Sequence, residues 1–117
     1  MKKYLPIALV TVLIGCATSR EMTREEMGMV HKAAGPYLQC VKNKALETKD
    51  GSDDVRLVVD TAMHNCEDAL TSVRQKLAEV GKTDEVFVVT WLRMVRQDVR
   101  SFVTEDVLKA KALKKSN

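Results

Sequence analysis

Apolar residues recur every three or four positions along most of this chain, which is the spacing that places side chains on one face of an α-helix. The first such pattern follows Thr23-Arg24-Glu25-Glu26, a match to a capping box with Thr23 as the N-cap. Its apolar positions are Met27, Val30, Ala34, Tyr37, Leu38, Val41 and Ala45. Gly35-Pro36 interrupts it, and because proline lacks a backbone donor we expect a bend that wraps the helix around its neighbours, with a hinge as the alternative.

A second helix is predicted to begin at Ser52-Asp53-Asp54, where hydroxyl and acidic side chains favour a helix N-terminus. Its stripe is regular, with spacings that alternate between three and four, the heptad pattern of an antiparallel bundle. The positions are Val55, Val59, Ala62, Cys66, Ala69, Val73, Leu77 and Val80. Gly81 then suits the C-terminal cap of this helix.

A third helix is predicted from Thr83-Asp84-Glu85. The run Val86-Phe87-Val88-Val89 has strand propensity, but a lone strand would lack a partner. The continuation is at helical spacing, through Trp91, Leu92, Val95, Val99, Phe102 and Val103. We therefore predict a helix that pauses near Thr104, resumes through Leu113, and frays at its lysine-rich tail.

These patterns together predict an all-α fold, a small three-helix bundle formed by residues 23–117. Residues 17–117 suffice for one small domain. A body of this size has a limited core and often depends on a covalent staple.

The N-terminal stretch has a different pattern. Lys2 and Lys3 precede the almost wholly apolar run from Leu5 to Ile14. A positive head followed by a short apolar run is typical of an export signal, and the run is too short for a finished membrane helix. Leu13-Ile14-Gly15-Cys16 resembles the lipobox of bacterial lipoproteins. A simple secretory signal and a membrane helix are the alternatives that we consider weaker.

The lipoprotein resemblance implies cleavage before Cys16, which then carries diacylglycerol on its sulfur and an acyl chain, such as palmitate, on its new amino group. Residues 1–15 would be the signal peptide and residues 16–22 a lipidated tether. In this family an Asp after the lipidated cysteine retains the protein in the inner membrane, and this chain has Ala17 there. The resemblance therefore implies an outer-membrane location facing the periplasm, with surface display as an alternative.

The charge balance argues against nucleic acid as a partner. The chain has 19 basic and 16 acidic residues, and loss of Lys2 and Lys3 with the signal would leave 17 basic residues against 16 acidic ones. Nucleic-acid-binding domains usually carry a strongly basic face, which a nearly neutral body does not predict.

Cys40 and Cys66 are the two cysteines left if Cys16 is acylated. In an oxidising compartment such a pair predicts a disulfide between helices one and two. The turn-like stretch that begins at Lys49 lies roughly midway between them, so a hairpin would bring both sulfurs to similar heights. The alternatives are buried free thiols, a redox pair, which would more typically show Cys-x-x-Cys, or metal ligands.

The sequence lacks the common motifs of catalytic sites. The sequence has no glycine-rich phosphate loop, no His-x-x-x-His, no Cys-x-x-Cys and no Gly-x-Ser-x-Gly. Its two histidines, His31 and His64, fall on distant parts of the predicted hairpin and are expected at the surface. We therefore expect no enzyme activity, metal site, cofactor or small-molecule substrate.

Two features of the third helix are candidates for binding. Phe87, Trp91 and Met94 make its apolar surface wider than one stripe, so they need a second neighbour. We favour the bent part of helix one as that neighbour, and the alternative is an envelope protein or a second copy of this chain. Arg93, Arg96 and Arg100 share another face, which either meets an anionic surface or is simply solvated.

The sequence thus leads us to expect a membrane-anchored, non-catalytic interaction or accessory protein of the cell envelope. One alternative is an exclusion or immunity lipoprotein that blocks an incoming machine or toxin. Another is a non-catalytic subunit of an envelope enzyme or secretion complex. Both alternatives rest on size and location.

Overall fold

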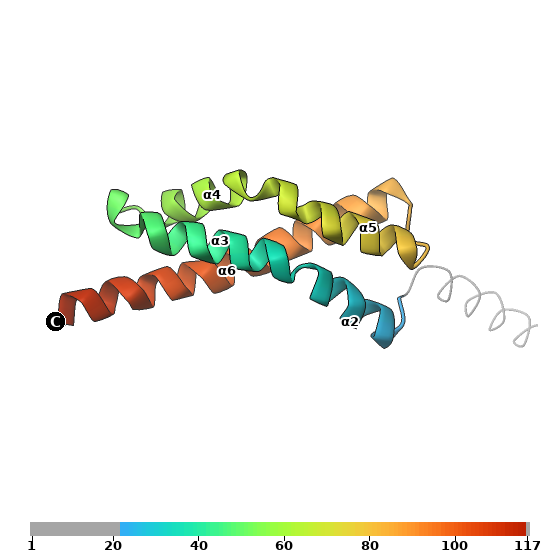
Figure 1. Cartoon of the computed structure of the whole chain (residues 1–117), viewed down its shortest axis with the longest axis horizontal. Helices are drawn as coiled ribbons and strands as arrows, with labels where there is room; N and C mark the ends of the chain where they lie inside the picture. Colours follow the sequence, from blue (N-terminus) through green and yellow to red (C-terminus); the bar gives the residue numbers. More distant parts are fainter. Residues whose placement is uncertain (1–21, 117) are drawn as a thin grey trace, which may run out of the picture.

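The computed structural model describes residues 22–116, and these residues form an all-α fold. The predicted signal peptide, the predicted lipidation site Cys16 and most of the predicted tether lie outside these residues. The described part contains five α-helices and two short 3₁₀ helices (Figure 1). They are α2 (Arg24–Ala33), α3 (Gly35–Thr48), η1 (Lys49–Gly51), α4 (Val55–Asn65), η2 (Glu67–Leu70), α5 (Thr71–Glu79) and α6 (Glu85–Ser116).

The predicted first helix is divided into α2 and α3. The predicted capping box is confirmed at the start of α2, where Thr23 Oγ1 accepts from the backbone N–H of Glu26 at 3.0 Å. The Thr23 N–H donates in turn to Glu26 Oε1 at 2.9 Å. Ala34 separates the helices, and Pro36 lies in the first turn of α3, where its missing N–H costs no helical hydrogen bond.

The predicted second helix is also divided, so the expectation of three helices is wrong for the described chain. Asp54 caps α4 by accepting from the backbone N–H groups of Arg56 and Leu57. The helix ends at Asn65, and η2 precedes α5. Leu70 is buried where the heptad pattern placed the half-buried Ala69. Gly81 follows α5 with φ of 79°, a conformation in which glycine has no Cβ penalty.

The predicted third helix is a single rod, α6, of 32 residues. The expected pause near Thr104 is wrong, because the helix is continuous from Glu85 to Ser116. The expected fraying is also wrong, since two tail lysines contact the chain near η1. Lys111 Nζ donates to the Ser52 carbonyl at 2.7 Å, and Lys114 Nζ lies 3.2 Å from Asp50 Oδ2.

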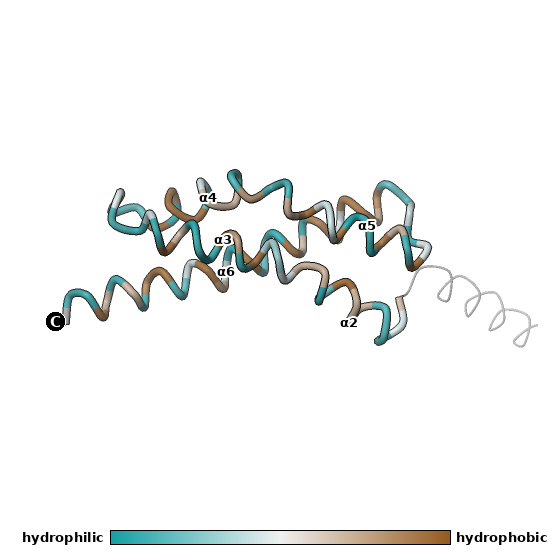
Figure 2. Tube along the Cα trace, viewed as in Figure 1, coloured by the Kyte–Doolittle hydropathy of each residue, from teal (hydrophilic) through white to brown (hydrophobic). Residues whose placement is uncertain are grey.

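The helices form an elongated bundle with one continuous core. α3 packs against α4 and α6, whereas α2 packs mainly against α5. α6 extends past the turn between α3 and α4 at its C-terminal end (Figure 1). Figure 2 shows apolar and polar residues alternating along each helix. Buried valines dominate the core, and Tyr37, Leu77 and Leu92 are its largest fully buried side chains. Among residues 22–116, no helix combines the length and hydropathy needed to cross a membrane.

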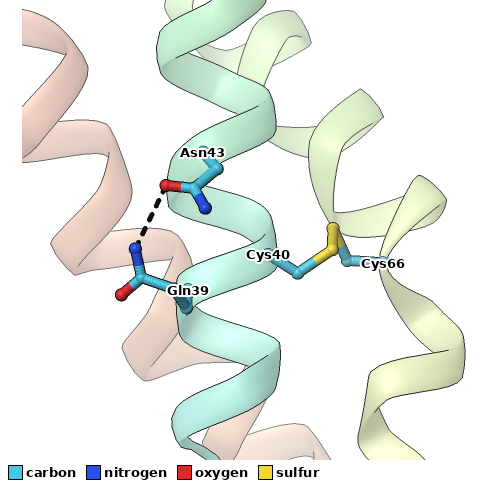
Figure 3. The surroundings of a disulfide bond; sticks show 4 residues. All are labelled: Gln39, Cys40, Asn43 and Cys66. Atoms are coloured by element: carbon cyan, nitrogen blue, oxygen red, sulfur yellow. Dashed lines mark hydrogen bonds between the residues drawn. A yellow bond between two sulfur atoms is a disulfide. The ribbon is translucent and has the colours of Figure 1, made fainter.

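A disulfide joins Cys40 of α3 to Cys66 at the C-terminal end of α4. The two Cα atoms are 5.9 Å apart, and Figure 3 shows the side chains reaching toward each other across the helix pair. Gln39 and Asn43 lie on another side of α3, where Gln39 Nε2 donates to Asn43 Oδ1 at 3.1 Å. The disulfide thus links α3 to the point where the predicted second helix is interrupted, between α4 and η2.

Candidate interaction surface

A groove separates the α2–α3 junction from the middle of α6. It has a volume of about 450 Å³. Its walls are mostly apolar, with Ala34 and Leu38 on one side and Val95, Val99 and Phe102 on the other. The groove exists because the bend at Ala34 directs α2 onto α5, while α3 stays against α6. Its volume is within the range of about 300–1,000 Å³ that is typical of binding pockets.

The predicted residues Phe87, Trp91 and Met94 are not equally covered. Phe87 and Trp91 are half-buried and pack against the core, and their ring centroids are 6.4 Å apart. His31 of α2 packs edge-on against Trp91, with 6.0 Å between ring centroids. The bent part of the predicted first helix is therefore the neighbour of Trp91, as we favoured from the sequence. Met94 remains 46% exposed.

Phe102 lies outside the core, contrary to the expectation from its spacing. Its spacing fitted the core pattern, yet it is 62% exposed and lines the groove. Val103 takes the core position instead and is fully buried. Two adjacent apolar residues on a helix point about 100° apart, so only one of them can face the core. The adjacent pair Phe102-Val103 was therefore the signal in the sequence that one apolar side chain would stay outside the core.

Phe102 belongs to a second row of side chains on α6, which we call the side stripe. Its members recur every three or four residues beside the buried stripe of the same helix. They are Phe87, Trp91, Met94, Asp98, Phe102, Glu105, Lys109 and Leu113. Asp98 lines the groove and forms no ion pair with another described residue. Leu113, near the C-terminus, is 66% exposed.

The predicted arginine row is largely engaged within the protein. The Arg96 guanidinium donates to both carboxylate oxygens of Glu67, and this hydrogen bonding raises the pKa of Arg96. Arg100 Nε donates to Asp60 Oδ1 at 3.1 Å. Of these three arginines, Arg93 alone is exposed without an ion pair to a described residue. The row therefore presents less positive charge for an anionic surface than its sequence spacing indicated.

Tyr37 lies beneath these ion pairs. Its side chain is fully buried, and its hydroxyl has no hydrogen-bond partner among the described residues. Burial raises the pKa of Tyr37, because a phenolate in an apolar surrounding is unfavourable, and the nearby Glu67 carboxylate raises it further. An unpaired buried hydroxyl lowers the stability of the folded state.

The two histidines are exposed, as expected from the sequence. Within residues 22–116, no cluster of three or more His, Cys, Asp or Glu side chains has the arrangement of a metal site. The groove has a more apolar lining than two other surface hollows of the described residues, which makes the groove and the adjoining side stripe our candidates for recognition. Comparisons with family models, curated proteins and solved structures give no match to this chain.

Proposed function

We propose that this chain is a lipid-anchored lipoprotein of the bacterial outer membrane that faces the periplasm and binds another protein without catalysis. The lipobox-like Leu13-Ile14-Gly15-Cys16 after an apolar run supports the anchor. Two or more acyl chains hold a protein stably at a bilayer, where one chain gives only reversible binding.

One observation supports the binding role above all. Met94 and Phe102 are 46% and 62% exposed, and they occupy the side stripe close to an apolar groove. Methionine and aromatic residues are enriched in protein interfaces. An apolar groove between helices is also the usual receptor for an amphipathic helix, which inserts its apolar face. The surface thus fits a helical protein partner better than an anionic lipid surface.

The anchor is tested by a cysteine substitution in the full chain. Cys16→Ser should abolish incorporation of radiolabelled palmitate and remove the protein from the outer-membrane fraction, because the acylated sulfur is lost. Cys40→Ala is the matched control and should retain both the label and the membrane location. Label that persists in Cys16→Ser would refute the anchor.

The binding role is tested in cells with a photo-reactive amino acid at Met94 of the full chain. A discrete crosslinked product is expected, whose composition mass spectrometry will identify. Leu57 of α4 is the control position, since it is apolar and 55% exposed but lies away from the groove lining. Equal products from both positions, or none from Met94, would count against this surface.

A further inference from the structure

Two neighbouring faces of α6 carry apolar side chains, and the rest of the bundle covers one of them fully but the other only at its N-terminal end, at Phe87 and Trp91. The covered face is the buried stripe that includes Val88, Leu92, Val95 and Val99. The side stripe lies next to it and continues from Met94 to Leu113 with spacings of four, four, three, four and four residues. The mean spacing is 3.8 residues, slightly more than the 3.6 residues of one helical turn, so the stripe winds slowly around α6. Two helices that pack along such a stripe cross with a right-handed twist.

We propose that the partner on the side stripe is a second copy of this chain, with the two α6 helices antiparallel. The inference rests on the proposed binding role and adds the identity of the partner. In the register that we infer, Asp98 of each copy lies opposite Lys109 of the other. Met94 then lies opposite Leu113, and Phe102 lies opposite Glu105 near the two-fold axis.

Charge complementarity selects this register and direction. In a two-fold dimer, residue i meets residue j and residue j meets residue i, so the Asp98–Lys109 pair forms twice. Asp98 has no ion-pair partner among the described residues of its own chain, and Lys109 is exposed, with Glu105 Oε1 at 3.1 Å. A parallel pair in register would instead place Asp98 opposite Asp98 and Lys109 opposite Lys109, which like-charge repulsion disfavours.

The apolar positions also match in this register. Met94 and Leu113, which are 46% and 66% exposed, would cover each other. The groove that Asp98 and Phe102 line leaves room for the C-terminal turns of the second α6. Lys111 and Lys114 hold those turns to the segment from Asp50 to Ser52 on another side of the helix, so Lys109 and Leu113 keep an outward position.

A zero-length carbodiimide crosslinker tests the register on the full chain in native membranes. The reagent joins a carboxylate directly to an amine, and mass spectrometry should find a peptide that links Asp98 to Lys109. Within one α6 these residues are eleven positions apart, about 16 Å along the axis, so a direct link must join two copies. The intrachain Lys42–Asp106 pair, at 3.7 Å, is an internal control for the reaction.

A charge exchange gives the second test. Asp98→Lys and Lys109→Asp should each lower the crosslinked dimer fraction at least about tenfold, because each variant places like charges opposite one another. The double variant should restore the dimer. For all three variants the dimer is measured by crosslinking differently tagged copies through amines other than those at positions 98 and 109. Arg93→Glu is the control on another face and should leave the dimer unchanged.

The outcomes separate this proposal from the general binding role. Loss with each single variant and recovery in the double variant supports the antiparallel dimer. Dimer that is unaffected by either single variant overturns the register. If the probe at Met94 captures a different envelope protein and the chain is monomeric, the proposed dimer is wrong while the proposed binding role stands. A monomer with no capture overturns both.

Discussion

At the scale of single residues, Tyr37 combines complete burial with an unpaired hydroxyl. We predict that Tyr37→Phe leaves the free energy of unfolding unchanged or raises it by up to about 1 kcal/mol, because the ring stays and the unsatisfied group is lost. Tyr37→Ala should lower it by about 3–5 kcal/mol through the cavity that forms. Urea unfolding measures both. A loss above about 1 kcal/mol in Tyr37→Phe would mean that the hydroxyl is hydrogen-bonded.

Tyr37 also gives a pH dependence with a definite sign. Its pKa is raised in the folded state, chiefly by burial, so the folded protein holds this proton more tightly than the unfolded chain. The stabilising contribution is therefore complete below pH about 10, the ordinary tyrosine pKa, and is lost as the pH rises through the higher folded value. Wild type should lose stability relative to Tyr37→Phe above that pH. Parallel curves for the two proteins would contradict this assignment.

Two glycines form a matched pair with opposite expectations. Gly28 is within α2, and a Cβ there would meet nothing within 4 Å, so Gly28→Ala should stabilise the protein by about 0.5–1 kcal/mol. Gly81 has equal space but a φ of 79°, so Gly81→Ala should destabilise it by about 1–2 kcal/mol. Thermal unfolding of the two variants compares them directly, and changes of the same sign would refute the backbone argument.

At the scale of helices, the disulfide constrains the pair α3 and α4. Replacing both Cys40 and Cys66 with alanine should lower the free energy of unfolding by about 3–4 kcal/mol, because the unfolded chain regains the conformational freedom of the loop that the disulfide closes. The sequence separation of the two cysteines is 26. Denaturant unfolding of the double variant against the oxidised wild type gives the difference. An unchanged midpoint would show that the bridge does not contribute to stability.

The helix boundaries also show what the sequence could predict. Thr23 and Glu26 predicted the start of α2 because a capping box is a local hydrogen-bond pattern. Pro36 predicted the first break for a similarly local reason. The break after Asn65 had no such signal, since neither glycine nor proline occurs from Val55 to Val80. Tertiary packing determines where such a helix ends, and the periodic pattern of apolar residues in the sequence does not indicate that end.

The candidate surface was predictable only in part for a related reason. Hydrophobic spacing identified the wide apolar face of the third helix through Trp91 and Met94. It did not decide between Phe102 and Val103, because both fit helical spacing. The groove depends on the direction that α2 takes after the bend at Ala34. Because tertiary packing sets that direction, the sequence pattern could not predict the groove.

At the scale of the whole molecule, the end of α6 is separable from the core. Val107 is the last buried core residue of the described chain, and beyond Ala110 the side chains of Lys111 and Lys114 contact the segment from Asp50 to Ser52. A chain that ends at Ala110 should keep its helical circular dichroism and lose no more than about 2 kcal/mol of stability. It should nevertheless lose the proposed dimer, because Leu113 is absent.

Sedimentation in mild detergent compares this shortened chain with the full-length Lys114→Ala control, which retains Leu113 and should remain dimeric. A shortened chain that stays dimeric would contradict the interface, whereas one that unfolds would contradict the separation of the tail from the core.

The Cys40–Cys66 bridge has a consequence for proteolysis. A protease that cuts at the exposed turn near Gly51 breaks the backbone inside the loop that the bridge closes. The two fragments then remain one covalent molecule, and electrophoresis without a reductant shows an apparently intact band. Such cleavage would become visible only after reduction, so a nicked population can persist while the total amount of the protein appears unchanged.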